Sequence, residues 1–205
     1  NQNSLFPILY PLIPRYYDNI LSEEIYLNML SSNSFKVNDK LYERVDLQII
    51  NMIKDAKKRL SENNVYLDEK IIIHGFSASA KFANRFTLLH PELVKLVIAG
   101  GLGGTLILPL RYIDSEELLY PVGVGNFSIV TDEKIKKFTN IKQFYYQGKK
   151  DMVDAFASVD DNSFFPYYKG IINSDELKQM YKFLGRDINT RWENTQKIYN
   201  ELCQD

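Results

Sequence analysis

The segment Lys70 to Phe82, KIIIHGFSASAKF, constrains the fold more than any other part of the chain. Its run of three isoleucines predicts a buried strand, and the residues after Ser77 have a helical pattern that continues to about Leu89. Between them lies Gly75-Phe76-Ser77-Ala78-Ser79, a G-x-S-x-G motif in which Ser79 replaces the last glycine. A strand, a sharp turn and a helix in this order are the setting that exposes a nucleophilic serine above a sheet.

Small residues surround Ser77 for a physical reason. Such a turn holds its serine in a strained backbone conformation, and strand and helix pass very close to each other there. The side chains next to the turn must therefore be small, as those of Gly75, Ser79 and Ala80 are. At a helix N-terminus the free N–H groups favour developing negative charge, so the N–H of Ala78 is the candidate oxyanion donor. Alternatively, Ser77 only caps the helix, a common role of serine. Ser79 is the weaker nucleophile candidate because it falls inside the first helical turn.

The rest of the chain alternates strand and helix patterns. We expect strands at Leu5–Leu12, Leu93–Ala99 and Ile141–Tyr146, and helices at 18–30, Asp39–Leu60, Asp132–Phe138, Asp175–Leu184 and Asp187–Leu202. Asn38 or Asp39 is expected to cap the helix that ends at Leu60. Apolar strands between helices predict a single α/β domain, with a mostly parallel sheet covered by helices on both faces.

Charge and composition narrow the possible partners. The formal net charge is −1, so no basic surplus indicates nucleic acid or an anionic membrane surface. No apolar run approaches the roughly 18 to 20 residues that cross a bilayer. With one cysteine, Cys203, and two histidines, the chain cannot form an internal disulfide and offers little for a zinc site, and we expect no metal or organic cofactor. These features assign no compartment.

Two segments resemble a known family. KIIIHGFSASAKFANRFTLLHPELVKLVIAGG is similar to the central part of α/β-hydrolase esterases, where a His-Pro-Glu turn leads to the next strand and a glycine pair. IKQFYYQGKKDMVD resembles their later strand, whose Gly-x-x-Asp pattern carries the triad acid and corresponds to Gly148 and Asp151. The resemblance covers Leu41 to Asp154 and is closest to bacterial esterases of the feruloyl esterase and polyhydroxybutyrate depolymerase-like kind. It implies an α/β-hydrolase fold and hydrolysis of a small-molecule ester by a serine.

Asp151 is the candidate acid of the triad. It lies in a loop after a strand, at the end where parallel α/β sheets place their sites. There it would orient a histidine and stabilise the imidazolium. Asp154, three residues further on, is the rival candidate, and a solvated loop aspartate without a catalytic role is the alternative for Asp151.

The histidine of the triad is missing from its expected place. The order in this fold is serine, acid, histidine, yet no histidine follows Asp151. His74 precedes the turn within the strand and is expected to be a packed, hydrogen-bonded residue pointing away from Ser77. His90 is expected to be structural, at the opposite end of the sheet. Three explanations compete. The chain has lost catalysis and binds a small ligand, or another residue serves as the base, or the chain is incomplete at both ends and the histidine lies beyond Asp205. We favour the last explanation.

Further segments are candidates for shaping the site. In AGGLGGT, Leu106 occupies the third glycine position of a dinucleotide motif and no helix pattern follows, which excludes that function. Gly101 and Gly103 are instead expected to line the site with Phe76 and Arg15, as substrate-binding residues. Residues 101–140 and 152–185, the second with the aromatic NSFFPYYKG, are possible lids over an apolar group, or else cover the core.

Overall fold

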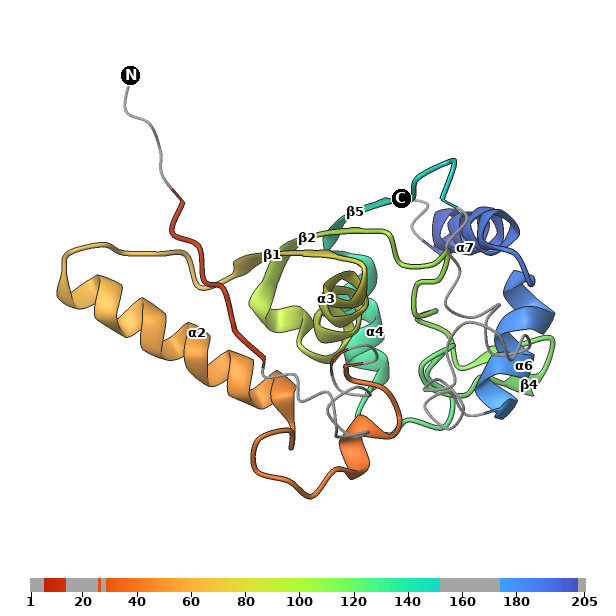
Figure 1. The fold of residues 1–205 in the computed structure, drawn as a ribbon, viewed down its shortest axis with the longest axis horizontal. Helices are drawn as coiled ribbons and strands as arrows, with labels where there is room; N and C mark the ends of the chain where they lie inside the picture. The colour runs from red at the N-terminus through yellow and green to blue at the C-terminus, as the bar shows by residue number, and fades with distance from the viewer. Residues whose placement is uncertain (1–5, 14–25, 27–28, 152–173, 203–205) are drawn as a thin grey trace.

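The computed structural model describes residues 6–13, 26, 29–151 and 174–202 (Figure 1). Its elements are η1 (Ser34–Lys36), α2 (Val45–Glu62), β1 (Ile71–Phe76), α3 (Ala78–Leu89), η2 (Pro91–Leu93), β2 (Val94–Gly100), β3 (Tyr112–Ile113), β4 (Glu116–Glu117), α4 (Asp132–Thr139), β5 (Lys142–Tyr146), α6 (Ser174–Leu184) and α7 (Ile188–Leu202). The protein is therefore of the α/β class. None of the helices in the described residues is long and apolar enough to span a membrane.

A three-stranded parallel sheet in the order β1-β2-β5 is the centre of the fold. Helix α3 packs against β1 and β2, and α4 packs against α3 on the same side of the sheet (Figure 1). Because the strands are parallel, their carboxyl ends meet at one edge. Phe76, Gly100 and Tyr146, the last residues of the three strands, are register partners across that edge.

The prediction of helices on both faces of the sheet is wrong for the described residues. Alternate residues of the outer strands are exposed on the face away from α3: Ile72 at 53%, Phe76 at 61% and Phe144 at 59%. Their neighbours Ile71 and Ile73 face the core instead. An uninterrupted apolar run is typical of a strand buried on both faces, but the run alone does not bring a second layer of helices.

Most predicted elements are confirmed, with small shifts at their ends. The structure bears out the helices α3, α4, α6 and α7 and the strands β1, β2 and β5. Helix α2 begins at Val45, six residues later than predicted, because Arg44 adopts a left-handed conformation with φ 46° that a continuing helix excludes. The carboxylate of Asp39 accepts the N–H of Leu41 at 2.9 Å, so it closes a turn before the helix and does not cap it.

The predicted strand at Leu5–Leu12 is also wrong, as far as it is described. Residues 6–13 form no strand, and their large apolar side chains are exposed except that of Ile13, which is half-buried against the core. Pro7 and Pro11 offer no N–H to a sheet ladder, which weakens the pairing of this segment with any neighbour. The predicted helix at 18–30 lies mostly outside the described residues.

The long connection from β2 to α4, residues 101–131, is built into the core. It contains the antiparallel pair β3–β4 and contributes many fully buried side chains, including those of Leu102, Leu108, Leu118, Tyr120 and Val124. The hydroxyl of Tyr120 donates to the carbonyl of Leu30 at 2.5 Å, and burial raises the pKa of this phenol. A lid role for residues 101–140 stays a prediction, and residues 152–173 of the second lid candidate lie outside the described residues.

Candidate functional site

Ser77 occupies the tight turn between β1 and α3. Its backbone has φ 58° and ψ −122°, a sparsely populated conformation for a residue with a side chain. A Cβ on Gly75 would lie 2.2 Å from the carbonyl oxygen of Ser79, so strand and helix pass as closely as the sequence predicts. The N–H of Ser77 donates to the carbonyl of Gly100 at 2.8 Å, which ties the turn to β2.

The hydroxyl of Ser77 does not cap α3. Ser77 stands at the N-cap position, yet its side chain makes no capping hydrogen bond, and the residue is exposed. Its carbonyl oxygen accepts the N–H groups of Ala80 and Lys81 at 3.0 and 3.2 Å, so the backbone alone starts the helix. Ala78 is the first residue of α3, where an N–H has no acceptor within its own helix. The turn therefore presents a serine hydroxyl beside an N–H that can hold an anion.

The second serine of the motif has a different role. The Oγ of Ser79 accepts the N–H of Phe76 at 2.9 Å and donates to the carbonyl of Phe76 at 2.8 Å. These two bonds fasten the end of β1 to the first turn of α3. Because the Ser79 hydroxyl is used both as an acceptor and as a donor by the backbone of Phe76, the geometry favours Ser77 as the reactive group.

Asp151 follows β5 at the same edge of the sheet. Its N–H donates to the carbonyl of Gly148 at 3.0 Å, and its Oδ2 accepts Nε2 of Gln147 at 2.8 Å. Since the amide nitrogen must face the carboxylate, the orientation of the Gln147 side chain is fixed. The oxygen of the Gln147 amide, Oε1, is buried and has no hydrogen-bond partner among the described residues. No motif in the sequence predicts this contact, and Asp154, the rival acid, lies outside the described residues.

Ser77 and Asp151 lie at one edge but not next to each other. Strand β2 separates β1 from β5, and two strand spacings amount to about 10 Å. An imidazole between a serine and a carboxylate bridges a gap of this kind, with one ring nitrogen toward each. A histidine that acted with both residues would have to lie between the ends of β1 and β5.

Neither histidine of the chain occupies that place. His74 lies in β1, three residues before Ser77, a distance of about 10 Å along an extended strand. It is exposed on the open face of the sheet, so the prediction that it is packed is wrong. The sheet has no described layer on this side that could bury it.

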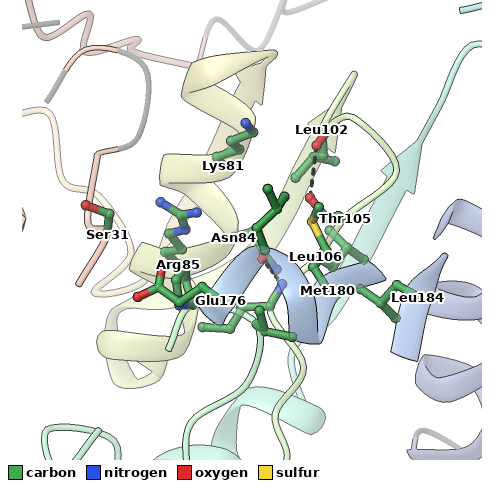
Figure 2. Close-up of a pocket in the computed structure, with 14 residues that line it drawn as sticks. Ser31, Lys81, Asn84, Arg85, Leu102, Thr105, Leu106, Glu176, Met180 and Leu184 are labelled. Carbon is green, nitrogen blue, oxygen red and sulfur yellow. Dashed lines mark hydrogen bonds between the residues drawn. The ribbon is translucent and has the colours of Figure 1, made fainter. Parts of the chain in front are cut away.

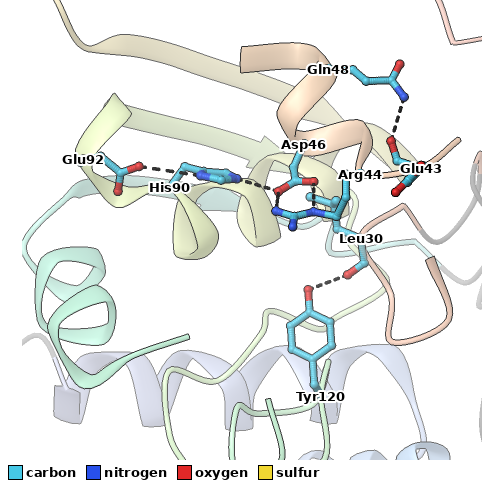
Figure 3. A network of polar contacts seen from close by, with 8 residues as sticks. All are labelled: Leu30, Glu43, Arg44, Asp46, Gln48, His90, Glu92 and Tyr120. Carbon is cyan, nitrogen blue, oxygen red and sulfur yellow. Dashed lines mark hydrogen bonds and ion pairs between the residues drawn. The ribbon is translucent and has the colours of Figure 1, made fainter. Parts of the chain in front are cut away.

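His90 belongs to a buried network at the far end of α3, as expected for a structural residue (Figure 3). Its Nε2 lies 2.8 Å from Oδ2 of Asp46, which is fully buried. Arg44 donates to both oxygens of the same carboxylate, from Nε at 2.9 Å and from Nη2 at 2.7 Å. Burial acts to raise the pKa of Asp46, but the hydrogen bonds from His90 and Arg44 outweigh it and hold this pKa well below its usual range.

Phe76, Gly101 and Tyr146 form an apolar rim at this edge of the sheet. The ring of Phe76 stacks on that of Tyr146, with centroids 6.4 Å apart. Gly101, with φ 66°, lies under the Phe76 ring, where a Cβ would come within 3.0 Å of it, and Gly103 has φ 70°. The Tyr146 ring lies over Gly100, a contact that the glycine pair in the sequence could have indicated. Arg15 lies outside the described residues.

A small cavity lies along the flank of α3, between that helix and α6 (Figure 2). Its volume is about 60 Å³, and Lys81, Arg85 and Glu176 are among its lining residues. Arg85 donates to the carbonyl of Met29 at 3.0 Å, and burial lowers the pKa of this guanidinium. Ligand pockets usually measure roughly 300 to 1,000 Å³. The cavity is therefore too small for an ester substrate, and Ser77 is not among its lining residues.

Comparisons with known proteins do not assign the chain to a family. Among the described residues, no group of three or more histidine, cysteine, aspartate and glutamate side chains could hold a metal ion. Neither the protein-family models, nor the curated proteins, nor the solved structures gave a match to this chain.

Proposed function

We propose that the protein is a serine hydrolase of the α/β-hydrolase fold that cleaves a carboxylic ester through an acyl-enzyme on Ser77. The observation that carries this proposal is the conformation of Ser77. A non-glycine residue at φ 58° and ψ −122°, between a strand and a helix, costs roughly 1 to 3 kcal/mol and presents its hydroxyl at the edge of the sheet. Such strain at a residue that does not cap its helix is typical of a functional turn.

The roles follow from the positions of the groups. The Oγ of Ser77 attacks the ester carbonyl while a base takes its proton, and the oxyanion meets the N–H of Ala78 at the positive end of α3. The base then gives the proton to the leaving alkoxide, and water hydrolyses the acyl-enzyme by the same steps. Asp151 orients the base, which the resemblance to α/β-hydrolases implies is a histidine.

The fold and the rim support the same proposal. The candidate acid follows a parallel strand that lies later in the chain than the nucleophile strand, as the order serine, acid, histidine requires. Gln147 holds one oxygen of Asp151, which fixes the carboxylate. The stacked rings of Phe76 and Tyr146 form an apolar surface beside Ser77 and favour an ester with an apolar group.

One observation favours a second candidate function. Neither His74 nor His90 is placed beside Ser77, so neither of these two histidines serves as its base. A protein that binds a small ester-like ligand without cleaving it would keep the same turn and rim. Both functions predict binding at this edge, but only the hydrolase releases an alcohol.

Hydrolysis of p-nitrophenyl acetate by the full-length protein tests the proposal. Ser77→Ala should lower kcat/KM by roughly a thousandfold or more, because it removes the nucleophile. The matched control is Ser79→Gly, which restores the usual glycine of the motif and should retain most of the activity. Folded wild-type protein that binds the ester without turnover would establish the second function instead. Equal rates in wild type and Ser77→Ala would refute catalysis at Ser77.

A further inference from the structure

The turn after β5 brings the side chain of Gln147 against the candidate acid. Tyr146, the last residue of β5, is fixed to β2 because its carbonyl accepts the N–H of Gly101 at 3.1 Å. The N–H of Asp151 donates to the carbonyl of Gly148 at 3.0 Å and closes a four-residue turn. Across this turn, Nε2 of Gln147 lies 2.8 Å from Oδ2 of Asp151. Hydrogen bonds to a carboxylate are among the strong ones, so this contact holds the acid in one orientation.

The donor in this contact is an uncharged amide. It orients the carboxylate of Asp151 without adding a positive charge that would neutralise it. A carboxylate accepts at about four lone-pair sites, so the bond at Oδ2 leaves it able to accept an N–H of the base as well. Lys149 and Lys150, the two cations of the same turn, are exposed. Gln147 can therefore fix the geometry of Asp151 while the negative charge stays available to stabilise an imidazolium.

A second glutamine on β5 differs from Gln147 in its hydrogen bonds. Gln143 has both ends of its amide paired, since Nε2 donates to the carbonyl of Phe138 at 2.8 Å and Oε1 accepts the hydroxyl of Tyr145 at 2.6 Å. In Gln147, Oε1 is buried and unpaired within the part of the chain that the structure describes, which costs stability. An amide paired at one end only contributes little to the fold, so its contact with Asp151 is the better explanation of its presence.

From this contrast we infer that Gln147 is a positioning residue of the hydrolase and holds the carboxylate of Asp151 in the orientation in which it meets the base. The inference rests on the proposed function, because Asp151 has a base to orient only if Ser77 is the nucleophile. A carboxylate that rotates away from the base slows the proton transfers of the reaction. It does not alter the surface that binds the ester. Loss of the Gln147 amide should therefore lower kcat and leave KM nearly unchanged.

Gln147→Met tests this role, because methionine has a similar length and shape but no N–H to donate. The substitution is made in wild type and in Asp151→Asn, and hydrolysis of p-nitrophenyl acetate by the full-length protein is measured. We expect kcat to fall roughly tenfold or more in the wild-type background and less than about twofold in Asp151→Asn, where the group that Gln147 positions has already lost its charge. KM should change less than about twofold in both backgrounds.

The matched control is Gln143→Met, which removes the amide of a glutamine on the same strand that does not contact Asp151. It should lower the free energy of unfolding and leave kcat close to its value in the parent protein. Circular dichroism should show every variant folded. A loss of kcat confined to Gln147→Met therefore reports on Asp151 and not on the general stability of β5.

Ser77→Ala, measured in the same assay, separates failure of this role from failure of the proposed function. An inactive wild type, or equal rates in wild type and Ser77→Ala, refutes both. When only Ser77→Ala is inactive, a wild-type kcat in Gln147→Met overturns the role of Gln147 alone. An equal loss in the two backgrounds also overturns it, because Gln147 would then act on the fold and not through Asp151. Full activity in Asp151→Asn overturns it as well, since Asp151 would not be the acid.

Discussion

The carbonyl oxygen of Ser79 lies 2.2 Å from the point where a side chain on Gly75 would place its Cβ. This oxygen belongs to the backbone of the first helical turn, so it cannot rotate away. Gly75→Ala should therefore lower the free energy of unfolding by about 1 to 3 kcal/mol or more. Urea denaturation measures the loss. Gly148→Ala is the control, since its Cβ would meet that of Asp151 at an ordinary 3.5 Å and should change stability by less than about 0.5 kcal/mol.

The strain at Ser77 predicts a difference between two substitutions. Ser77→Gly relieves the unfavourable φ of 58°, whereas Ser77→Ala keeps a Cβ in it. The glycine variant should be more stable than the alanine variant by about 1 kcal/mol, although glycine usually costs stability elsewhere. Thermal unfolding of the two proteins gives the comparison. An alanine variant that is equally or more stable would show that the turn is unstrained.

The buried carboxylate of Asp46 predicts acid sensitivity. Its pKa in the folded protein is below the unfolded value of about 4, so the unfolded chain binds a proton more readily as the pH falls. The stability from this group is present above about pH 4 and is lost progressively below it. Urea unfolding at pH 7 and pH 3 should show the loss in wild type.

Asp46→Asn is the test of that assignment. Removing the charge leaves Arg44 and His90 without their shared partner, and should cost roughly 3 to 5 kcal/mol at pH 7. The variant should also lose less stability than wild type between pH 7 and pH 3. A variant whose acid sensitivity equals that of wild type would place the titrating group elsewhere.

The two candidate acids can be separated by amide substitutions. Asp151→Asn should lower kcat/KM for a chromogenic ester by roughly 10³- to 10⁴-fold, because the amide no longer stabilises an imidazolium. Asp154→Asn should change it by only a few fold. Both substitutions preserve size, so unfolding curves should remain close to those of wild type. The reverse ranking would make Asp154 the acid.

The elements on either side of the turn at Ser77 were predictable because their signals are local. The isoleucine run, the helical spacing after Ser77 and the stop before Pro91 together place β1, α3 and the turn between them. The need for small residues at Gly75 and Ser79 was predictable from the same turn, because strand and helix approach each other closely there. These features depend on neighbours within a few residues, which the sequence itself supplies.

Features that depend on distant parts of the chain were not predictable. An apolar strand reads the same whether one or both faces are covered, so the exposure of Ile72 and Phe144 has no sequence signal. The left-handed residue Arg44 delays α2, although the apolar spacing continues through it. The bond from Gln147 to Asp151 depends on a loop conformation that no motif specifies.

Labelling with a fluorophosphonate, followed by mass spectrometry of the peptide that contains both serines, tests the central claim most directly. The probe reacts with an activated serine hydroxyl and leaves a covalent adduct on its Oγ. In full-length, folded protein we expect one adduct, on Ser77, and none after Ser77→Ala. An adduct on Ser79, or no adduct on folded wild-type protein, would contradict the assignment of Ser77 as the nucleophile.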